Sequence, residues 1–405
     1  MKHVTITNMT GSRNGGCEAL VRSIIDGLVA TCGEDAFDIA IDSNDPEYDA
    51  YVFRDRVCRV TKIAGLPPSG WSVNAQRRFF GMPSPLLKLA SRGHYRSIDN
   101  LKKSDLLIAT GGDVFTSDYN AFPRHARTLQ VGTPVALLAQ TLGPFAPSDA
   151  ERFRRSMDNI ALCTVRESET FDYLKSEFPD LPVEQTADVA FLLSVTTPDE
   201  ARRILEEEHH FSVEGRRLVG LSISSGILSY RKDLSPEQYL NEVAGFVDNL
   251  NGRGYSVIII PHVQERSHRN NDVYACREVL QRLRKPKENL LLSLSTLSAS
   301  DYKGVIGLCE VLLGARTHAT IASMSQGIPT VSIAYSRKAW GIMRDYYGKE
   351  LGERLTMDVS ALNRERLMDA FDAALANGRT ESIAADMKRR AQINFDRVKA
   401  FLAKG

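Results

Sequence analysis

Arg316 and His318 are the residues whose types and spacing point most directly to chemistry. An apolar run at 311–313 predicts a strand before them, and the spacing of apolar residues over 319–324 predicts a helix after them, with Thr317 as a suitable N-cap. Both side chains therefore flank a helix N-terminus, where free N–H groups and the helix dipole favour an anion. An arginine fork and a titratable imidazole there suit proton-coupled chemistry on a phosphate or carboxylate. The alternative is an ordinary turn with a structural ion pair.

The elements that must position this pair alternate between strand and helix along the whole chain, which predicts a parallel α/β architecture. A chain of 405 residues also exceeds one ordinary core, so two domains are expected. We expect strands at 3–7, 38–41, 50–53, 106–110, 135–140, 161–165 and near 183, and then at 218–222, 256–260, 291–292, 311–313 and 330–333.

These strands divide into two groups, and each group can build its own doubly wound sheet. We expect an N-terminal Rossmann-like domain over 1–195, a second over 196–360, and C-terminal helices over 361–405. The junction carries a Thr-Thr-Pro-Asp turn followed by an acidic helix over 199–208. The two domains would face each other over a central cleft, because such sheets bind ligands at the C-terminal ends of their strands.

Two glycine-rich turns follow predicted strands of the first domain. Asn14, Gly15, Gly16 and Glu18 lie in a turn that opens a helix but matches neither the dinucleotide fingerprint nor the phosphate loop of nucleotidases. Its backbone N–H groups can hold an anion or a hydroxyl-rich ligand. The second turn, 110–113, places Gly112 before an aspartate that can accept a proton from a sugar hydroxyl or can instead cap a helix.

Three further residues follow predicted strands. Gly143 belongs to a rigid turn before a proline. Arg166 either reaches into the cleft or pairs with a neighbouring glutamate. His262 is either a second acid or base, or an ordinary loop histidine.

Composition limits the class of protein. The apolar and charged fractions, 43% and 25%, are those of a globular protein, and the net charge of +1 argues against a nucleic-acid partner. Six scattered cysteines form no metal motif and suit a reducing cytoplasm. The N-terminus lacks the features of a signal peptide, no apolar run is long enough to cross a membrane, and no residue cluster has the spacing of metal ligands. These features predict a cytoplasmic protein.

One segment, 54–103, departs from this balance. It holds eleven basic residues and two acidic ones, together with several aromatic residues and prolines. Such a segment over a cleft suits an anionic acceptor or an anionic membrane surface. The alternative is a helix with a solvated basic face.

Taken in order, the motifs resemble those of the polysaccharide pyruvyl transferase family. The matching stretches are 14–20, 111–113, 140–145, 165–174, 187–192 and 316–329. The resemblance implies the two-domain GT-B-like fold and transfer of pyruvate from phosphoenolpyruvate to two sugar hydroxyls, with a cyclic ketal and free phosphate as products. It also implies that Arg316 and His318 bind the donor. Thr317 stands where the family usually has leucine, and the residues after Gly16 depart from the usual aspartate, which leaves the role of Glu18 open.

The sequence thus predicts a cytoplasmic pyruvyltransferase, either free or associated with a membrane, that acts on a cell-surface polysaccharide or its lipid-linked precursor. It needs phosphoenolpyruvate as donor and no nucleotide or redox cofactor, while the metal requirement and oligomeric state stay open. The alternatives are a GT-B glycosyltransferase or sugar-nucleotide epimerase that uses a nucleotide-sugar, and a catalytically silent binding protein. The predicted catalytic residues are His318 and Asp113, and the predicted substrate-binding residues are Arg316, Thr317, Arg166, Asn14, Gly15, Gly16, Glu18, Gly112, Gly143 and His262.

Overall fold

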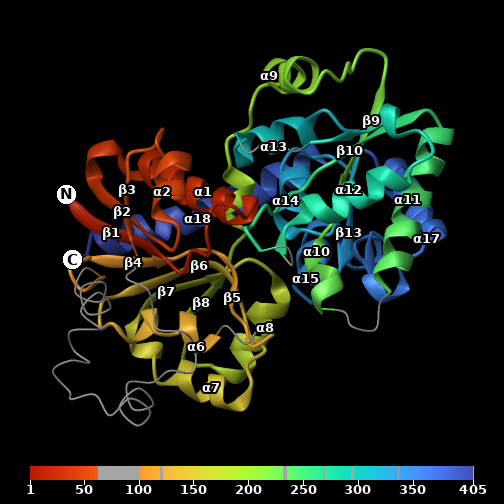
Figure 1. Ribbon diagram of the computed structural model, residues 1–405. Helices are drawn as coiled ribbons and strands as arrows, with labels where there is room; N and C mark the ends of the chain where they lie inside the picture. The colour runs from red at the N-terminus through yellow and green to blue at the C-terminus, as the bar shows by residue number, and fades with distance from the viewer. Residues whose placement is uncertain are drawn as a thin grey trace, which may run out of the picture.

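Two parallel sheets covered by helices form the two halves of the molecule (Figure 1). This computed structural model describes residues 1–62, 101–118, 122–230, 235–267, 270–292, 296–335 and 337–404. The strand orders are β3-β2-β1-β4-β6-β7-β8, with β5 beside β6, and β11-β10-β9-β12-β13-β14. Both orders are those of doubly wound Rossmann-type sheets. The predicted fold, two Rossmann-like halves in a GT-B-like arrangement, is confirmed.

Within the described residues, the first half holds eight strands and five labelled α-helices. Its strands are β1 (Lys2–Thr7), β2 (Phe37–Ser43), β3 (Arg59–Lys62), β4 (Leu106–Ala109), β5 (Gly112–Phe115), β6 (Val135–Leu142), β7 (Ile160–Val165) and β8 (Val183–Gln185). Its helices are α1 (Gly15–Cys32), α2 (Pro46–Val52), α6 (Phe122–His125), α7 (Pro147–Arg154) and α8 (Ser168–Glu177). The short 3-10 turn η4 (Val189–Leu192) leads into the second half.

The second half follows the same plan with six strands. They are β9 (Arg217–Ser222), β10 (Tyr255–Ile259), β11 (Leu290–Leu291), β12 (Val311–Gly314), β13 (Thr330–Ala334) and β14 (Thr356–Asp358). Its helices are α9 (Pro198–Arg203), α10 (Ser225–Tyr230), α11 (Pro236–Gly252), α12 (Asp272–Arg282), α13 (Ala299–Gly307), α14 (Thr317–Met324), α15 (Arg337–Tyr347) and α16 (Lys349–Arg354). Helices α17 (Arg364–Asn377) and α18 (Glu381–Leu402) close the chain.

The differences from the predicted elements fall on short segments. The strand expected at 50–53 is instead the end of α2, whose first residue, Pro46, is a favoured helix start. Strands β3, β5 and β14 were not predicted, because three or four residues carry too little periodicity to identify a strand. The helix expected over 199–208 is α9 followed by a π-helical turn, Ile204–Glu208. The two expected C-terminal helices are confirmed.

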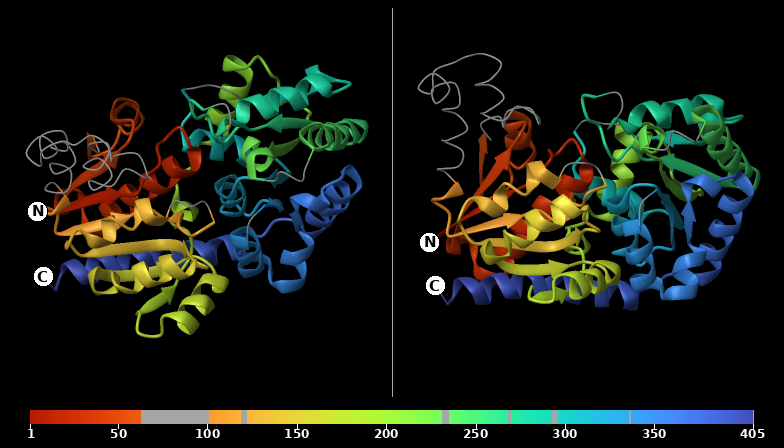
Figure 2. Two further views of the ribbon diagram at one scale, coloured as in Figure 1. Left: turned by 60° about the horizontal axis from the view of Figure 1, so that its bottom comes forward. Right: turned by 90° about the horizontal axis from the view of Figure 1, so that it is seen from below.

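Helix α18 returns from the second half to the first sheet. Figure 2 shows it running along the first half, and it packs against α1, η4, β6 and β7. Its buried Asn394 donates from Nδ2 to the carbonyl oxygen of Ala187 (3.1 Å), and Arg390 donates to the carbonyl oxygen of Thr186 (2.9 Å). The last helix therefore ties the two halves together, while the domain boundaries at 195 and 360 stay predictions.

A contact between α8 and α15 holds the halves together at a second place. The backbone N–H and hydroxyl of Ser168 donate to the carboxylate of Asp345 (2.8 and 2.6 Å), and Arg344 pairs with Glu169 (2.7 Å).

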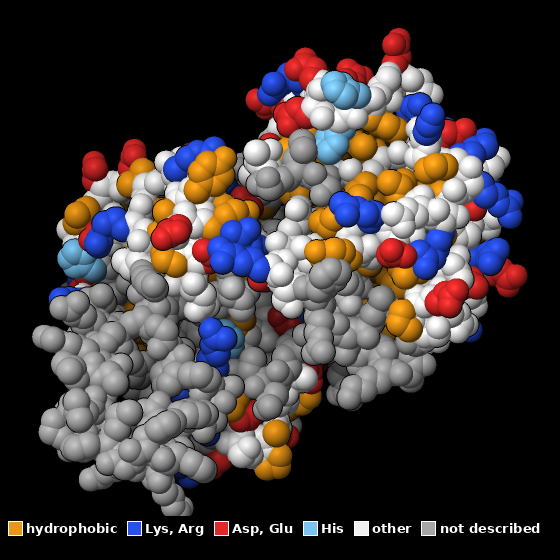
Figure 3. Space-filling model, viewed as in Figure 1, with side chains coloured by type: hydrophobic (Ala, Val, Ile, Leu, Met, Phe, Trp, Pro, Cys, Tyr) orange, Lys and Arg blue, Asp and Glu red, His pale blue; other side chains and the backbone are white. Residues whose placement is uncertain are grey.

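The face shown in Figure 3 carries acidic and basic side chains interspersed over the second half. Among the described residues, no helix is long and apolar enough to cross a bilayer.

Lys303 on α13 makes a buried contact with the connection between the halves. Its ammonium group donates to the carbonyl oxygen of Leu193 (2.6 Å), and burial, together with the charge of Lys388, lowers the pKa of Lys303 to about 7. In the unfolded chain Lys303 has the ordinary pKa near 10.5. Between about pH 7 and 10.5 the unfolded chain therefore binds a proton on this lysine that the folded chain does not, so the free energy of unfolding rises with pH.

We therefore expect the free energy of unfolding of Lys303→Met to rise less steeply with pH than that of the wild type. Between about pH 7 and 9 the wild type should gain on the order of 2 kcal/mol in free energy of unfolding relative to the variant. Urea denaturation at both pH values measures this difference, with Lys287→Met, an exposed lysine of the same half, as control. Parallel pH curves for wild type and Lys303→Met would show that the lysine is not titrating in the folded state.

Candidate active site

A cavity of about 250 Å³ lies between the two halves, at the C-terminal ends of their central strands. The loops after β1 and β4 line it from one side, and the loops after β10 and β12 line it from the other. In the first half this is the point where the strand order reverses, between β1 and β4, and in the second half the cavity lies beside β12, where that order reverses next to β9. Such reversal points are the usual ligand site of these sheets. Eight of the predicted site residues line the cavity together: Asn14, Gly112, Asp113, Arg166, His262, Arg316, Thr317 and His318.

A sharp turn after β12 places the N-terminus of α14 at the cavity. The helix begins at Thr317, and the N-cap is Arg316, so the prediction of Thr317 as N-cap is wrong by one residue. The carbonyl oxygen of Arg316 accepts from the N–H groups of Ala319 and Thr320 (3.0 and 3.1 Å). Within the described residues, the N–H groups of Thr317 and His318 have no hydrogen-bond partner. They form the part of this site that attracts an anion.

Arg316 itself is held in a bidentate ion pair. Its Nε and Nη2 donate to the two carboxylate oxygens of Asp272 (3.0 and 2.7 Å), and Nη2 also lies 3.3 Å from Oδ1 of Asn270. Asp272 is fully buried and accepts from the backbone N–H groups of Ser225 and Val263 (both 3.0 Å). The ion pair considered as the alternative at the sequence level is thus present, and it fixes the loops around the cavity.

His318 lies beside a second buried ion pair. Its Nε2 is 3.6 Å from Oδ2 of Asp188, which accepts from Nη1 of Arg166 (2.7 Å). Burial alone would raise the pKa of Asp188, but contact with His318 and the charge of Arg166 hold that pKa well below its ordinary value. Arg166 also donates from Nε to the hydroxyl of Thr141 (2.9 Å). Among the described groups it pairs with Asp188, not with the neighbouring glutamates.

Asp113 lies in β5 and is not a helix N-cap. It makes an ion pair across the cavity with Lys338, which α15 of the second half contributes. Burial alone would raise the pKa of Asp113, but the charges of Lys338 and Arg166 lower it to about 2. A carboxylate with so low a pKa is a poor proton acceptor near neutral pH. The geometry therefore supports Asp113 as a hydrogen-bond acceptor rather than as the base that the sequence suggested.

His262 is buried in the wall of the cavity. Neither ring nitrogen has a hydrogen-bond partner among the described residues. Burial, then the nearby charges of His318 and Arg316, lower the pKa of His262 to about 3. The imidazole is therefore neutral near neutral pH, which suits hydrogen bonding to a ligand and does not suit a second general acid.

Gly15 and Gly16 allow the two halves to approach each other. The N–H of Gly15 donates to the carbonyl oxygen of His262 (2.9 Å), and that of Gly16 donates to Oδ1 of Asn14, the N-cap of α1 (3.0 Å). Both N–H groups are used within the protein, so the expected anion cradle at this turn is not present in this form. A Cβ on Gly15 would lie 3.0 Å from the carbonyl oxygen of His262, and one on Gly16 would overlap Nδ1 of His318.

This close approach predicts that Gly16→Ala displaces the His318 ring. We expect kcat to fall about tenfold or more, because an angstrom-scale misplacement of a reacting group has effects of this size or larger. Steady-state phosphate release measures the loss, and Gly252→Ala, where an added Cβ meets no atom within 4 Å, is the matched control. Full activity in Gly16→Ala would mean that the ring position does not matter for turnover.

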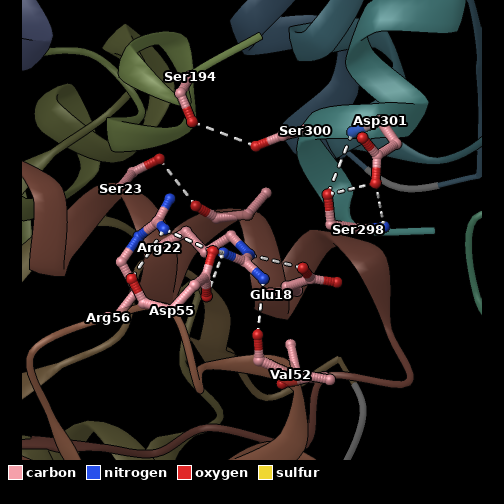
Figure 4. A network of polar contacts seen from close by, with 12 residues as sticks. Glu18, Arg22, Ser23, Val52, Asp55, Arg56, Ser194, Ser298, Ser300 and Asp301 are labelled. Carbon is pink, nitrogen blue, oxygen red and sulfur yellow. Dashed lines mark hydrogen bonds and ion pairs between the residues drawn. The ribbon is translucent and has the colours of Figure 1, made fainter. Parts of the chain in front are cut away.

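Glu18 and Gly143 are not brought into this cavity. The Glu18 carboxylate is buried on α1 and accepts from Nε of Arg22 (2.6 Å), in a network that also includes Asp55 and Val52 (Figure 4). Its assignment to substrate binding is therefore corrected to a structural role. Gly143 lines a smaller adjoining cavity, which shares Asp113 and Lys338 with the first.

Sequence reasoning missed two charged residues of the site. Lys338 follows β13 closely, so the rule that ligands bind after strands would have pointed to it. Asp188 lies in a motif that was recognised for the family but was given no role. No group of three or more His, Cys, Asp or Glu side chains within the described segments can hold a metal ion.

The sequence model described as polysaccharide pyruvyl transferase matches residues 14–337. The chain belongs to this family. A relative named amylovoran biosynthesis protein AmsJ, from Erwinia amylovora, is 23% identical over 399 residues, which cover 93% of this chain and 92% of the relative. This chain is therefore a transferase of polysaccharide biosynthesis.

Solved structures resemble this chain in fold alone. A UDP-GlcNAc 2-epimerase from Neisseria meningitidis has a TM-score of 0.60 at 13% identity, with all of both chains covered. A UDP-GlcNAc 2-epimerase from Methanocaldococcus jannaschii has a TM-score of 0.60 at 11% identity over the same extent. Identities this low carry no information about the ligand of this chain.

Proposed function

We propose that the protein transfers pyruvate from phosphoenolpyruvate to two hydroxyls of a sugar, which forms a cyclic ketal and releases phosphate. The observation that carries this proposal is the cavity between the halves, where the N-terminus of α14, His318 and Lys338 converge. Phosphoenolpyruvate carries its phosphate on C2, next to the carboxylate carbon, and two anionic groups so close together require more than one cationic or N–H-rich contact. Family membership supports a polysaccharide acceptor.

The phosphate of phosphoenolpyruvate suits the free N–H groups of Thr317 and His318 at the start of α14. Lys338, which comes from α15, offers a cation to the carboxylate. In this arrangement His318 lies beside the bridging oxygen of the phosphate, where a titratable ring can exchange protons.

The reaction balances without a redox step. Each of the two sugar hydroxyls forms a bond from oxygen to C2 of the donor, while the bond from C2 to the bridging oxygen breaks and the double bond between C2 and C3 becomes a single bond. Of the two hydroxyl protons, one ends on C3, which becomes a methyl group, and the other leaves with phosphate. Asp113 and the neutral ring of His262 supply hydrogen-bond partners for hydroxyls and oxyanions in this cavity.

We infer that the acceptor is a cell-surface polysaccharide or its lipid-linked precursor, and that the enzyme works in the cytoplasm, with peripheral membrane contact through the segment 54–103. Most of that segment lies outside the described residues. Three of its arginines are described, and two of them are in ion pairs: Arg56 with Asp26 (2.6 Å) and Arg59 with Asp38. No nucleotide or redox cofactor enters the proposed reaction.

Ligand-dependent stability tests the donor assignment. Phosphoenolpyruvate should raise the melting temperature of the protein in a concentration-dependent way, whereas UDP and GDP should not. The reverse result would favour a nucleotide-sugar enzyme, the alternative that shares this fold. Stabilisation by neither ligand would remove the support for phosphoenolpyruvate as donor.

A further inference from the structure

We propose that Asp188 orients His318 and fixes its tautomer, so that Nδ1 is the ring nitrogen that exchanges a proton with bound substrate. The exchange rests on the proposed pyruvyl transfer, but the orientation and the tautomer do not. The two ring nitrogens of a histidine are distinct, and the partner of one sets the role of the other.

Nε2 faces a carboxylate whose position is fixed. The atom is buried, and it lies 3.6 Å from Oδ2 of Asp188. Asp188 is 1% exposed, receives a hydrogen bond from Arg166 on Oδ2, and accepts on Oδ1 from the N–H of Ala190 (2.8 Å) at the start of η4. An anion held from two sides cannot easily turn away from the ring.

Nδ1 lies on the opposite edge of the ring, toward the other half of the molecule. It is next to the backbone of Gly16, where a side chain would overlap it. Among the described residues, no hydrogen bond involves Nδ1, although His318 lines the cavity. Because Nε2 is enclosed, Nδ1 is the nitrogen that a ligand in the cavity can reach.

The carboxylate decides which nitrogen carries the proton. An anion beside Nε2 favours the neutral tautomer with hydrogen on Nε2, which leaves a lone pair on Nδ1. Nδ1 can then accept the proton of an acceptor hydroxyl as its oxygen bonds to C2. The imidazolium, which Asp188 stabilises, returns that proton to the bridging phosphate oxygen as the bond to C2 breaks. The proton of the other hydroxyl ends on C3.

Several charges around the ring offset one another. Among the described residues, the charged or titratable groups that line the cavity with His318, or lie beside its ring, are Asp188, Arg166, Asp113, Lys338, Arg316, His262, His125, Tyr335 and Cys17. Only Asp188 has an atom within ion-pair distance of a ring nitrogen among the described residues. Asp188 is therefore a positioning residue for His318.

Nitrogen-15 NMR of the histidine side chains reads the tautomer without any substrate. In the wild type we expect pyrrole-type Nε2 and pyridine-type Nδ1 for His318, with the resonances assigned by their loss in His318→Gln. In Asp188→Asn the preference should shrink or reverse. Wild-type protein with hydrogen on Nδ1, or an unchanged tautomer in Asp188→Asn, would overturn the proposal. If Asp188→Asn does not fold, the wild-type spectrum alone decides.

Kinetics give the second readout. Asp188→Asn should lower kcat roughly 100-fold or more with little change in the KM for phosphoenolpyruvate, and should move the acid limb of the kcat profile to lower pH. Asp149→Asn, a buried carboxylate outside the cavity, should change neither. Absence of any phosphate release by the wild type would instead count against the proposed function, and the NMR result would stand apart from it. An unshifted pH profile in an active Asp188→Asn would reject the role of Asp188.

Discussion

His318→Gln is expected to lower kcat by roughly 100-fold or more while the protein stays folded. Glutamine keeps a hydrogen-bonding group in the cavity, but it cannot accept and release a proton near neutral pH. The KM for phosphoenolpyruvate should change much less, because the N–H groups at the start of α14 do not depend on the side chain. Phosphate release from phosphoenolpyruvate and acceptor measures both constants.

The melting temperature of His318→Gln should stay within a few degrees of the wild type, since the side chain contributes no hydrogen bond among the described residues. His3→Gln, on the exposed start of β1, is the matched control and should leave kcat unchanged. A large loss of stability with turnover preserved per folded molecule would place His318 in the structure and not in the reaction.

Lys338→Met is expected to weaken phosphoenolpyruvate binding about 30-fold or more, because a charge-assisted contact to an anionic ligand is lost. The same change leaves the Asp113 carboxylate in the cavity without its lysine, which repels the ligand further. Calorimetric titration of phosphoenolpyruvate into wild type and variant measures the difference.

Two further variants separate these effects. The double variant Lys338→Met with Asp113→Asn removes the repulsion and should recover part of the affinity for phosphoenolpyruvate. Lys349→Met on α16, which changes the same residue type outside the cavity, is the control. Unaltered affinity in Lys338→Met would show that the lysine serves only as the ionic partner of Asp113. The donor carboxylate would then need another site.

The sequence identified Arg316 as a site residue, but it did not identify the residue that pairs with it. Its position after β12 was predicted from the strand, the small residues and the helix signal, and this local pattern is reliable because it involves neighbours in the chain. Its partner Asp272 is 44 residues away, on α12, and no local pattern could connect them. Replacement of Arg316 would therefore leave a buried carboxylate uncompensated, so loss of activity alone cannot assign it to the donor.

The glycines of the first loop are a second case in which the sequence predicted the local feature but not its partner. The sequence indicated a close backbone approach at Gly15 and Gly16, and the structure has one. The approaching groups are the carbonyl of His262 at Gly15 and the ring of His318 at Gly16, both from the other half, and not an anion. Hydrogen-bond partners across two domains depend on how the domains meet. The doubly wound architecture, in contrast, followed from the alternation of strands and helices, which each segment encodes locally.

A structure of the protein with phosphoenolpyruvate bound tests the proposed reaction at its source. We expect the phosphate at the N–H groups of Thr317 and His318, the carboxylate within reach of Lys338, and the bridging oxygen beside Nδ1 of His318. Phosphoenolpyruvate bound elsewhere, or a nucleotide diphosphate occupying this cavity in its place, would contradict the assignment of the cavity to pyruvyl transfer.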